Sequence, residues 1–142
     1  MSKRILIVDD DAQIRASLRK ALRAEGYEVI LAADGQEGIE RFHESPVDLL
    51  LLDLNLPVTS GWDTFERLTS INPFVPIVII TGRRDQRDLA SAAGVGALFE
   101  KPFDVPLLLE SIKELLAEPP ETHLKRLTGL QTCLRRVRTT IG

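Results

Sequence analysis

The chain has 142 residues, of which 44% are hydrophobic and 27% charged, which is typical of one globular domain with its own core. No apolar stretch is long enough to cross a bilayer, the N-terminus lacks a signal-peptide pattern, and the single cysteine, Cys133, excludes an internal disulfide, so we expect a cytoplasmic protein without membrane contact. The net charge of −3 divides into −7 for residues 1–118 and +4 for residues 119–142, which argues against nucleic acid as a ligand of residues 1–118.

Short apolar runs alternate with helical patterns along residues 1–118. Runs at 5–8, 29–31, 49–52, 77–80 and 97–99 predict five strands. Apolar residues at helical spacing predict five helices. The first contains Ile14 to Leu22 and ends at Gly26, and the second contains Ile39 and Phe42 after a turn at Asp34-Gly35. The third starts at Gly61, contains Phe65 to Ile71 and ends before Asn72-Pro73; the fourth contains Leu89 to Ala93 and ends at Gly94; the fifth contains Val105 to Leu116 and ends before Pro119-Pro120. This alternation predicts an α/β fold, an open parallel sheet with helices on both faces.

Polar residues follow four of the five runs. In a parallel sheet the C-terminal ends of all strands lie along one edge, where ligands bind. The residues at these ends are the aspartates 9, 10 and 11, then Asp53, Thr81-Gly82 and Glu100-Lys101-Pro102. Carboxylates, a hydroxyl and an ammonium are therefore expected to converge at this edge.

The charges of this group indicate its chemistry. Clustered carboxylates without histidine or cysteine suit a hard cation held by oxygen ligands, and we expect Mg²⁺. A lysine and a hydroxyl beside such a cation suit a phosphoryl group, and an aspartate can act as a covalent nucleophile towards phosphorus.

Five stretches together resemble the receiver domain of bacterial two-component response regulators. They are ILIVDDD (5–11), DGQEGIE (34–40), LLLLDLNLP (49–57), IVIITG (77–82) and FEKPF (99–103). The resemblance covers residues 3–118 and implies a flavodoxin-like, doubly wound five-stranded parallel sheet with strand order 2-1-3-4-5. We expect residues 1–118 to be the receiver domain and residues 119–142 a basic C-terminal extension.

The resemblance also implies roles at the matching positions. Asp53 is the acceptor of a phosphoryl group from a sensor histidine kinase or a phosphotransfer protein. Asp10 binds Mg²⁺ directly, Asp9 assists through water, and Asp53 and the backbone carbonyl of Asn55 complete the metal ligands that the protein supplies.

Further implied roles concern the switch. Lys101 pairs with the phosphate, and Thr81 donates a hydrogen bond to it. The hydrogen bond from Thr81 reshapes the face made by the fourth helix, fifth strand and fifth helix, through which the protein meets an output partner or a second copy. The Lys101-Pro102 peptide bond is implied to be cis, whereas only about 5–6% of X-Pro bonds are cis in folded proteins.

The sequence departs from the family pattern at the switch. The family usually has an aromatic residue three positions before the lysine, where this chain has Leu98, and Phe99 follows on the opposite side of the strand. The usual rotation of an aromatic side chain is therefore in doubt. Asn55 and Arg83 occupy the two variable positions that adjust dephosphorylation in the family.

Other residues have simpler interpretations. Asp11 precedes a helix and is expected to be its N-cap. We expect Trp62, His43 and His123 to be packing or surface residues, Cys133 to be an inert thiol, and Asp34-Gly35 to be a turn.

Three functions compete. The first is a phosphorylation-controlled signalling module that is an enzyme only in assisting its own phosphorylation and dephosphorylation. The second is a fragment of a DNA-binding regulator or other effector whose output domain is absent. The third is a hydrolase with an aspartyl-phosphate intermediate, which the presence of Asn55 in place of a second aspartate disfavours. A flavin-binding role is disfavoured because no phosphate-binding loop follows the first strand.

The tail contains a short coiled-coil-like stripe: Leu127, Leu130, Leu134, Val137 and Ile141. Two heptads and an interior glycine, Gly129, are weak support for a helix. Three interpretations stay open: a helix packed on its own domain, a dimerisation or signalling helix, and a disordered basic segment that meets an acidic partner or nucleic acid.

Overall fold

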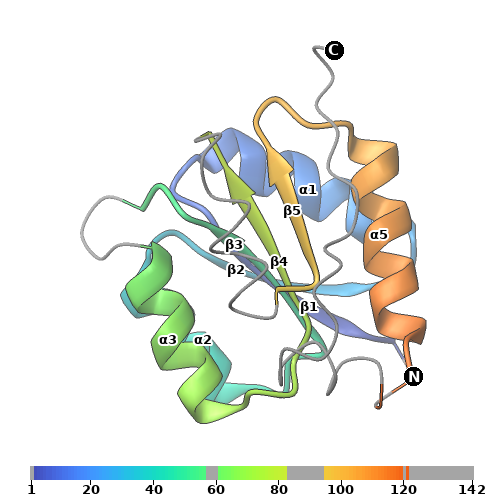
Figure 1. The fold of residues 1–142 in the computed structure, drawn as a ribbon. Coiled ribbons are helices and arrows are strands. Elements are labelled where there is room, and N and C mark those ends of the chain that lie inside the picture. Colours follow the sequence, from blue (N-terminus) through green and yellow to red (C-terminus); the bar gives the residue numbers. More distant parts are fainter. Residues whose placement is uncertain (1, 57–60, 83–94, 120, 122–142) are drawn as a thin grey trace. The chain divides into compact units, whose positions relative to one another are not determined.

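The structure is a computed structural model that describes residues 2–56, 61–82, 95–119 and 121 (Figure 1). The chain divides into two compact units, Met1–Val75 and Pro76–Gly142. The first unit contains β1 (Arg4–Val8), α1 (Ala12–Ala24), β2 (Glu28–Ala32), α2 (Gly35–Glu44), β3 (Leu49–Asp53) and α3 (Gly61–Ile71). The second contains β4 (Ile77–Thr81), β5 (Ala97–Glu100) and α5 (Val105–Ala117).

The five strands follow the order β2-β1-β3-β4-β5, as predicted. In the first unit β1 pairs in parallel with β2 on one side and with β3 on the other, with Val8 opposite both Ala32 and Leu52. Ile5 to Val8 of β1 and every residue of β3 are buried, because helices cover both faces of these strands. The unbroken apolar runs in the sequence reflect this two-sided burial.

The helices of the first unit lie on opposite faces of its strands. In Figure 1, α1 lies on one face and α2 and α3 lie side by side on the other. α1 ends in a Schellman motif, in which Gly26 has a φ of +91° and the N–H of Tyr27 donates to the carbonyl of Leu22 at 3.2 Å. A glycine at this position avoids the steric cost that a side chain brings to left-handed backbone.

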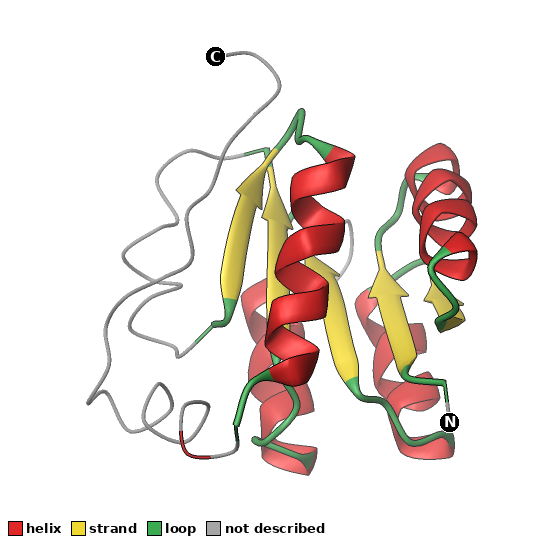
Figure 2. Ribbon diagram, turned by 90° about the vertical axis from the view of Figure 1, so that its right-hand side faces the viewer, coloured by secondary structure: helices red, strands yellow, loops and turns green. Residues whose placement is uncertain are grey.

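The second unit is built around a two-stranded parallel pair. Figure 2 shows β4 and β5 side by side, with Thr81 opposite Glu100, and α5 next to them. A Cβ on Gly96 would lie 2.8 Å from Leu115 Cδ2, so a larger residue there would require the Leu115 side chain to shift. Asp104 is the N-cap of α5, and its carboxylate accepts from the N–H of Leu107 at 3.2 Å.

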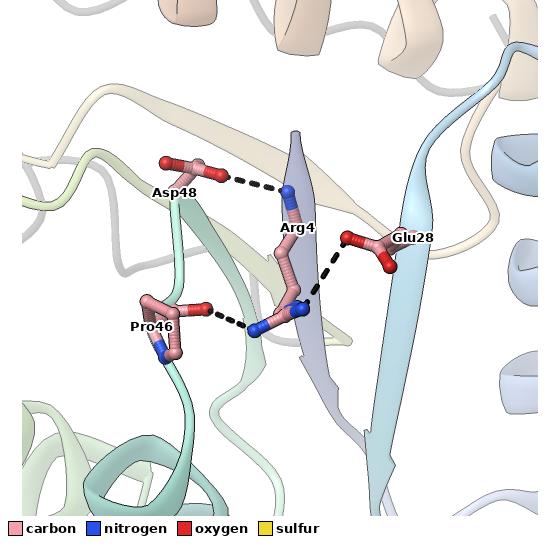
Figure 3. Close-up of polar contacts among 4 residues, drawn as sticks. All are labelled: Arg4, Glu28, Pro46 and Asp48. Atoms are coloured by element: carbon pink, nitrogen blue, oxygen red, sulfur yellow. Dashed lines mark hydrogen bonds and ion pairs between the residues drawn. The ribbon is translucent and has the colours of Figure 1, made fainter. Parts of the chain in front are cut away.

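A polar cluster joins the N-terminal ends of β1, β2 and β3 (Figure 3). The side chain of Arg4 contacts Glu28 at 3.4 Å and the carbonyl of Pro46 at 3.5 Å, while its backbone N–H donates to Asp48 Oδ2 at 2.8 Å. This cluster lies at the end of β1 opposite to Asp9.

The predicted elements agree with the described ones in type and order, with some differences in detail. Each strand extends one or two residues beyond its apolar run, for example β4 to Thr81 and β5 to Glu100. Ile39 is only half-buried and Ile71 is exposed. The predicted helix from Leu89 to Ala93 lies outside the described residues, as do residues 120 and 122–142 of the tail. None of the described helices is long and apolar enough to cross a membrane.

Candidate phosphoacceptor and metal site

Three aspartates form an acidic cluster in the first unit. Asp9, Asp10 and Asp53 each offer a carboxylate oxygen, and these oxygens lie within 4.8 Å of one another. Asp9 and Asp53 are buried, whereas Asp10 is exposed. The cluster therefore combines two carboxylates held in the interior with one that faces solvent.

The register of the sheet brings the cluster together. Val8 of β1 lies opposite Leu52 of β3, so the next residues along the two parallel strands, Asp9 and Asp53, lie next to each other at the C-terminal end. The predicted convergence of these two carboxylates is thus a direct consequence of strand register.

Backbone N–H groups orient both buried carboxylates in the same way. The N–H of Asp11 donates to Asp9 Oδ1 at 2.8 Å, and the N–H of Asn55 donates to Asp53 Oδ1 at 2.9 Å. Each carboxylate thus accepts from the residue two positions later, in an Asx turn that ends its strand. Such a bond fixes the orientation of the carboxylate.

The consecutive aspartates 9, 10 and 11 have different environments. Asp11 is the N-cap of α1, as predicted, and its Oδ1 accepts from the N–H groups of Gln13 and Ile14 at 2.8 and 3.3 Å. Asp9 is buried against the sheet, and Asp10 lies between them with an exposed side chain. Helix capping therefore accounts for one aspartate and leaves the acidic cluster to the other two.

Arg15 contacts the backbone beside the acidic cluster, and the sequence pattern did not predict this contact. Its Nη1 donates to the backbone carbonyl of Asp9 at 2.8 Å, from a half-buried side chain on the first turn of α1. In the sequence Arg15 is one of four basic residues on this helix, with Arg19, Lys20 and Arg23, and the other three are exposed. The one signal in the sequence that separates Arg15 from these three residues is its place in the first turn of the helix, beside the apolar face.

The donor set of the cluster fits a hard divalent cation. Its groups are carboxylate oxygens, which Mg²⁺ and Ca²⁺ prefer, and the cluster contains no thiolate or imidazole. Asn55, whose carbonyl was predicted to be a further ligand, is exposed at the end of the Asx turn of Asp53. The cluster can thus offset the repulsion of its carboxylates by holding a cation.

Thr81 and Lys101 lie together in the second unit, at the C-terminal ends of β4 and β5. The N–H of Lys101 donates to the carbonyl of Thr81 at 2.7 Å, which extends the ladder by one bond. Thr81 is fully buried and Lys101 is half-buried. The Lys101-Pro102 peptide bond is cis, as the resemblance implied.

Leu98 and Phe99 are both buried, with 2% and 1% of their surface exposed. Phe99 makes an edge-to-face contact with Phe103, with ring centroids 6.4 Å apart. Leu98 is therefore a core residue of β5, although alternation places it opposite to Phe99.

The remaining predicted residues have ordinary surroundings or lie outside the description. Trp62 is half-buried and packs edge-to-face on Phe65 at 5.4 Å, and His43 is exposed on α2. Asp34 is the N-cap of α2, accepting from Glu37 N–H at 2.8 Å. Arg83, His123 and Cys133 lie outside the described residues.

Comparison with known families and proteins gives consistent matches. The family model of the response regulator receiver domain matches residues 5–113. The chain is 36% identical over 117 residues to the transcriptional regulatory protein PrrA of Mycobacterium bovis, covering 81% of this chain and 50% of that protein. It is 33% identical over 129 residues to the response regulator ArlR of Staphylococcus saprophyticus, covering 89% and 58%. The chain thus spans about half the length of the curated relatives it matches.

Solved structures show the same fold. A CheY-like response regulator receiver domain protein from Methanospirillum hungatei matches with a TM-score of 0.79 and 36% identity, over 86% of this chain and 98% of that one. The response regulator TrrA from Thermotoga maritima, solved in complex with Mg²⁺ and BeF, matches with a TM-score of 0.73 and 32% identity, over 80% and 98%.

Proposed function

This chain belongs to the family of response regulator receiver domains, and from that premise we propose that it accepts a phosphoryl group on Asp53 with the help of Mg²⁺. The observation that carries the proposal is the cluster of Asp9, Asp10 and Asp53 at the ends of β1 and β3. Asp53 is buried, and the N–H of Asn55 orients its carboxylate.

The proposed reaction is a phosphoryl transfer from a phosphohistidine of a sensor kinase or phosphotransfer protein, in the cytoplasm. A carboxylate oxygen of Asp53 forms a bond to phosphorus while the bond from phosphorus to the donor's imidazole nitrogen breaks, and that nitrogen keeps the electron pair. Asp9, Asp10, Asp53 and the backbone carbonyl of Asn55 hold Mg²⁺. When bound, Mg²⁺ supplies positive charge that offsets the charge of the phosphoryl oxygens.

We assign the response to the phosphoryl group to the second unit. Lys101 supplies a point charge and Thr81 a hydrogen bond to the phosphoryl oxygens. Thr81 ends β4, Lys101 follows β5, and a hydrogen bond joins their backbones. Leu98, buried beside them in β5, takes the position of the usual aromatic, so we place the switch on Thr81 and the backbone of β5.

The output is proposed to run through the face made by the fourth helix, the fifth strand and the fifth helix, where the domain meets an output protein or a second copy. Since the chain spans about half of relatives that include transcriptional regulatory proteins, an output domain that binds DNA is the second candidate. Residues 119–142 are the connection to such a domain in that case.

Intact mass after incubation with Mg²⁺ and acetyl phosphate tests the phosphoacceptor. The wild-type chain is expected to gain one phosphoryl group, and Asp53→Asn is expected to gain none. Asp34→Asn is the matched control, because asparagine also caps a helix and Asp34 lies outside the acidic cluster. A wild-type chain that binds Mg²⁺ yet gains no mass contradicts the proposal.

A further inference from the structure

Arg15 links α1 to the segment that carries the proposed metal ligands. Its Nη1 donates to the backbone carbonyl of Asp9 at 2.8 Å, across six residues of sequence. We infer that Arg15 is a positioning residue for the divalent cation: it holds the Asp9–Asp10 segment in the geometry that binds the metal. This inference rests on the magnesium site proposed above.

The backbone of Asp9 needs such a partner because the sheet ends there. The N–H of Asp9 donates to the carbonyl of Ala32 at 3.1 Å, and Ala32 is the last residue of β2. The carbonyl of Asp9 lies beyond the paired part of the ladder, where a backbone acceptor requires a partner from elsewhere. Arg15 supplies it through a charge-assisted bond, which is stronger than a neutral one.

Asp9 is consequently held at three atoms. Its N–H is bound to β2, its carbonyl to the side chain of Arg15, and its Oδ1 to the N–H of Asp11 at the start of α1. Without the bond from Arg15 the peptide unit between Asp9 and Asp10 loses the side-chain bond that ties its carbonyl to α1. Both predicted metal ligands flank that peptide unit.

Two effects of Arg15 on cation binding have opposite signs. Its positive charge repels a cation, whereas its hydrogen bond orders the carboxylates that bind it. The guanidinium contacts a carbonyl and not one of the clustered carboxylates in the described bond. Outer-shell hydrogen bonds of this kind typically change metal affinity about 10–100-fold. We expect the positioning effect to dominate.

Calorimetric measurement of Mg²⁺ binding to the whole 142-residue chain, at fixed ionic strength, separates the two effects by sign. Arg15→Met removes the donor and the charge but keeps an apolar stem, and the dissociation constant for Mg²⁺ is expected to rise about 10–100-fold. Arg19→Met removes the same charge from an exposed position one turn further along α1, and it is expected to leave the constant unchanged or slightly lower. Arg15→Lys, which keeps a charged donor, is expected to recover part of the affinity.

Unchanged or tighter Mg²⁺ binding by Arg15→Met overturns the inference, because charge alone then explains the residue. If circular dichroism shows that Arg15→Met does not fold, Arg15→Gln is used in its place and is compared with Arg19→Gln. Weaker Mg²⁺ binding by Arg15→Gln than by Arg19→Gln supports the positioning role of Arg15. Equal Mg²⁺ binding by the two variants overturns that role. Failure of the proposed function has another signature: wild-type protein that binds Mg²⁺ without accepting a phosphoryl group. The Mg²⁺ constants decide the role of Arg15 in either case.

Discussion

Arg4 and Asp48 are joined by two hydrogen bonds that run in opposite directions. The N–H of Arg4 donates to Asp48 Oδ2 at 2.8 Å (Figure 3). The N–H of Asp48 donates to the carbonyl of Arg4, also at 2.8 Å. The pair connects residues 44 positions apart in sequence and fixes where β3 begins beside β1. It lies about 16 Å from the acidic cluster along β1, at about 3.3 Å per residue.

Replacement of Asp48 is therefore expected to affect stability and not the site. Asp48→Ala removes a charged acceptor from a half-buried N–H, which costs about 1–3 kcal/mol. Glu28→Ala, which removes the ion pair with Arg4, is expected to cost less than about 1 kcal/mol because the two side chains are 31% and 55% exposed. Urea unfolding of both variants measures the difference in unfolding free energy. Equal losses of unfolding free energy would show that the hydrogen bonds with Asp48 stabilise the fold no more than the exposed ion pair with Glu28 does.

The adjacent residues Asp10 and Asp11 are expected to separate metal binding from stability. Asp11→Ala removes the N-cap of α1 and is expected to cost about 0.5–2 kcal/mol in unfolding free energy while Mg²⁺ still binds. Asp10→Ala removes an exposed carboxylate of the cluster and is expected to abolish Mg²⁺ binding without lowering the urea midpoint. The two measurements are Mg²⁺ calorimetry and urea unfolding, and a loss of Mg²⁺ affinity in Asp11→Ala would contradict the assignment.

Without Mg²⁺, Asp53→Asn is expected to be more stable than the wild-type chain. The carboxylates of Asp9, Asp10 and Asp53 lie within 4.8 Å and repel one another, and asparagine removes one charge while its amide oxygen can still accept from the N–H of Asn55. The expected result is a higher melting temperature for Asp53→Asn than for the wild type. Thermal unfolding in EDTA tests this, with Asp34→Asn as the control. Added Mg²⁺ should raise the melting temperature of the wild type and of Asp34→Asn, but not that of Asp53→Asn.

Gly38 is expected to be coupled to Val8. A Cβ on Gly38 would lie 2.8 Å from Val8 Cγ2, so Gly38→Ala should force α2 away from β1 and cost about 1–3 kcal/mol. In the double variant with Val8→Ala the collision is gone, and the combined loss is expected to be smaller than the sum of the two single losses. Additive losses in a double-mutant cycle measured by urea unfolding would show that the helix does not pack against Val8 this closely.

The raised pKa of Tyr27 predicts that the folded chain loses stability at alkaline pH. Burial, and then the negative charge of Glu25, raise the pKa of the Tyr27 phenol above 10.0. An unfolded chain with the ordinary pKa loses the proton first, so the contribution of Tyr27 is complete below pH 10 and is lost as the pH rises towards the raised pKa. Tyr27→Phe removes this dependence. The difference in unfolding free energy between wild type and variant should change above pH 10 and stay constant between pH 7 and 9.

The acidic cluster was predictable because it depends on chain order. Asp9 and Asp53 each follow an apolar run, and parallel strands place such residues at one edge. Thr81 at the end of β4 and Lys101 just after β5 were predictable for the same reason. The cap at Asp11 was predictable because capping depends only on local backbone.

The contacts of Arg4 and Arg15 were not predictable from pattern. Both are long side chains whose partners depend on strand register or on the path of a short connection. Arg15 lies in a run of basic residues that resembles a solvated helix face. Ile71 had the spacing of a core residue but is 38% exposed, because it is the last residue of α3, where the chain leaves the core.

The connection between β1 and α1 consists of three residues, and all three are aspartates. The first ends the strand, the second faces solvent and the third starts the helix, so the connection has no spare position. An inserted or deleted residue would exchange these tasks whatever its chemical type. Substitutions at exposed positions of α1, such as Arg19, should therefore be tolerated, whereas a change in the length of this connection should not. Insertion scanning should find a sharp minimum of tolerance there.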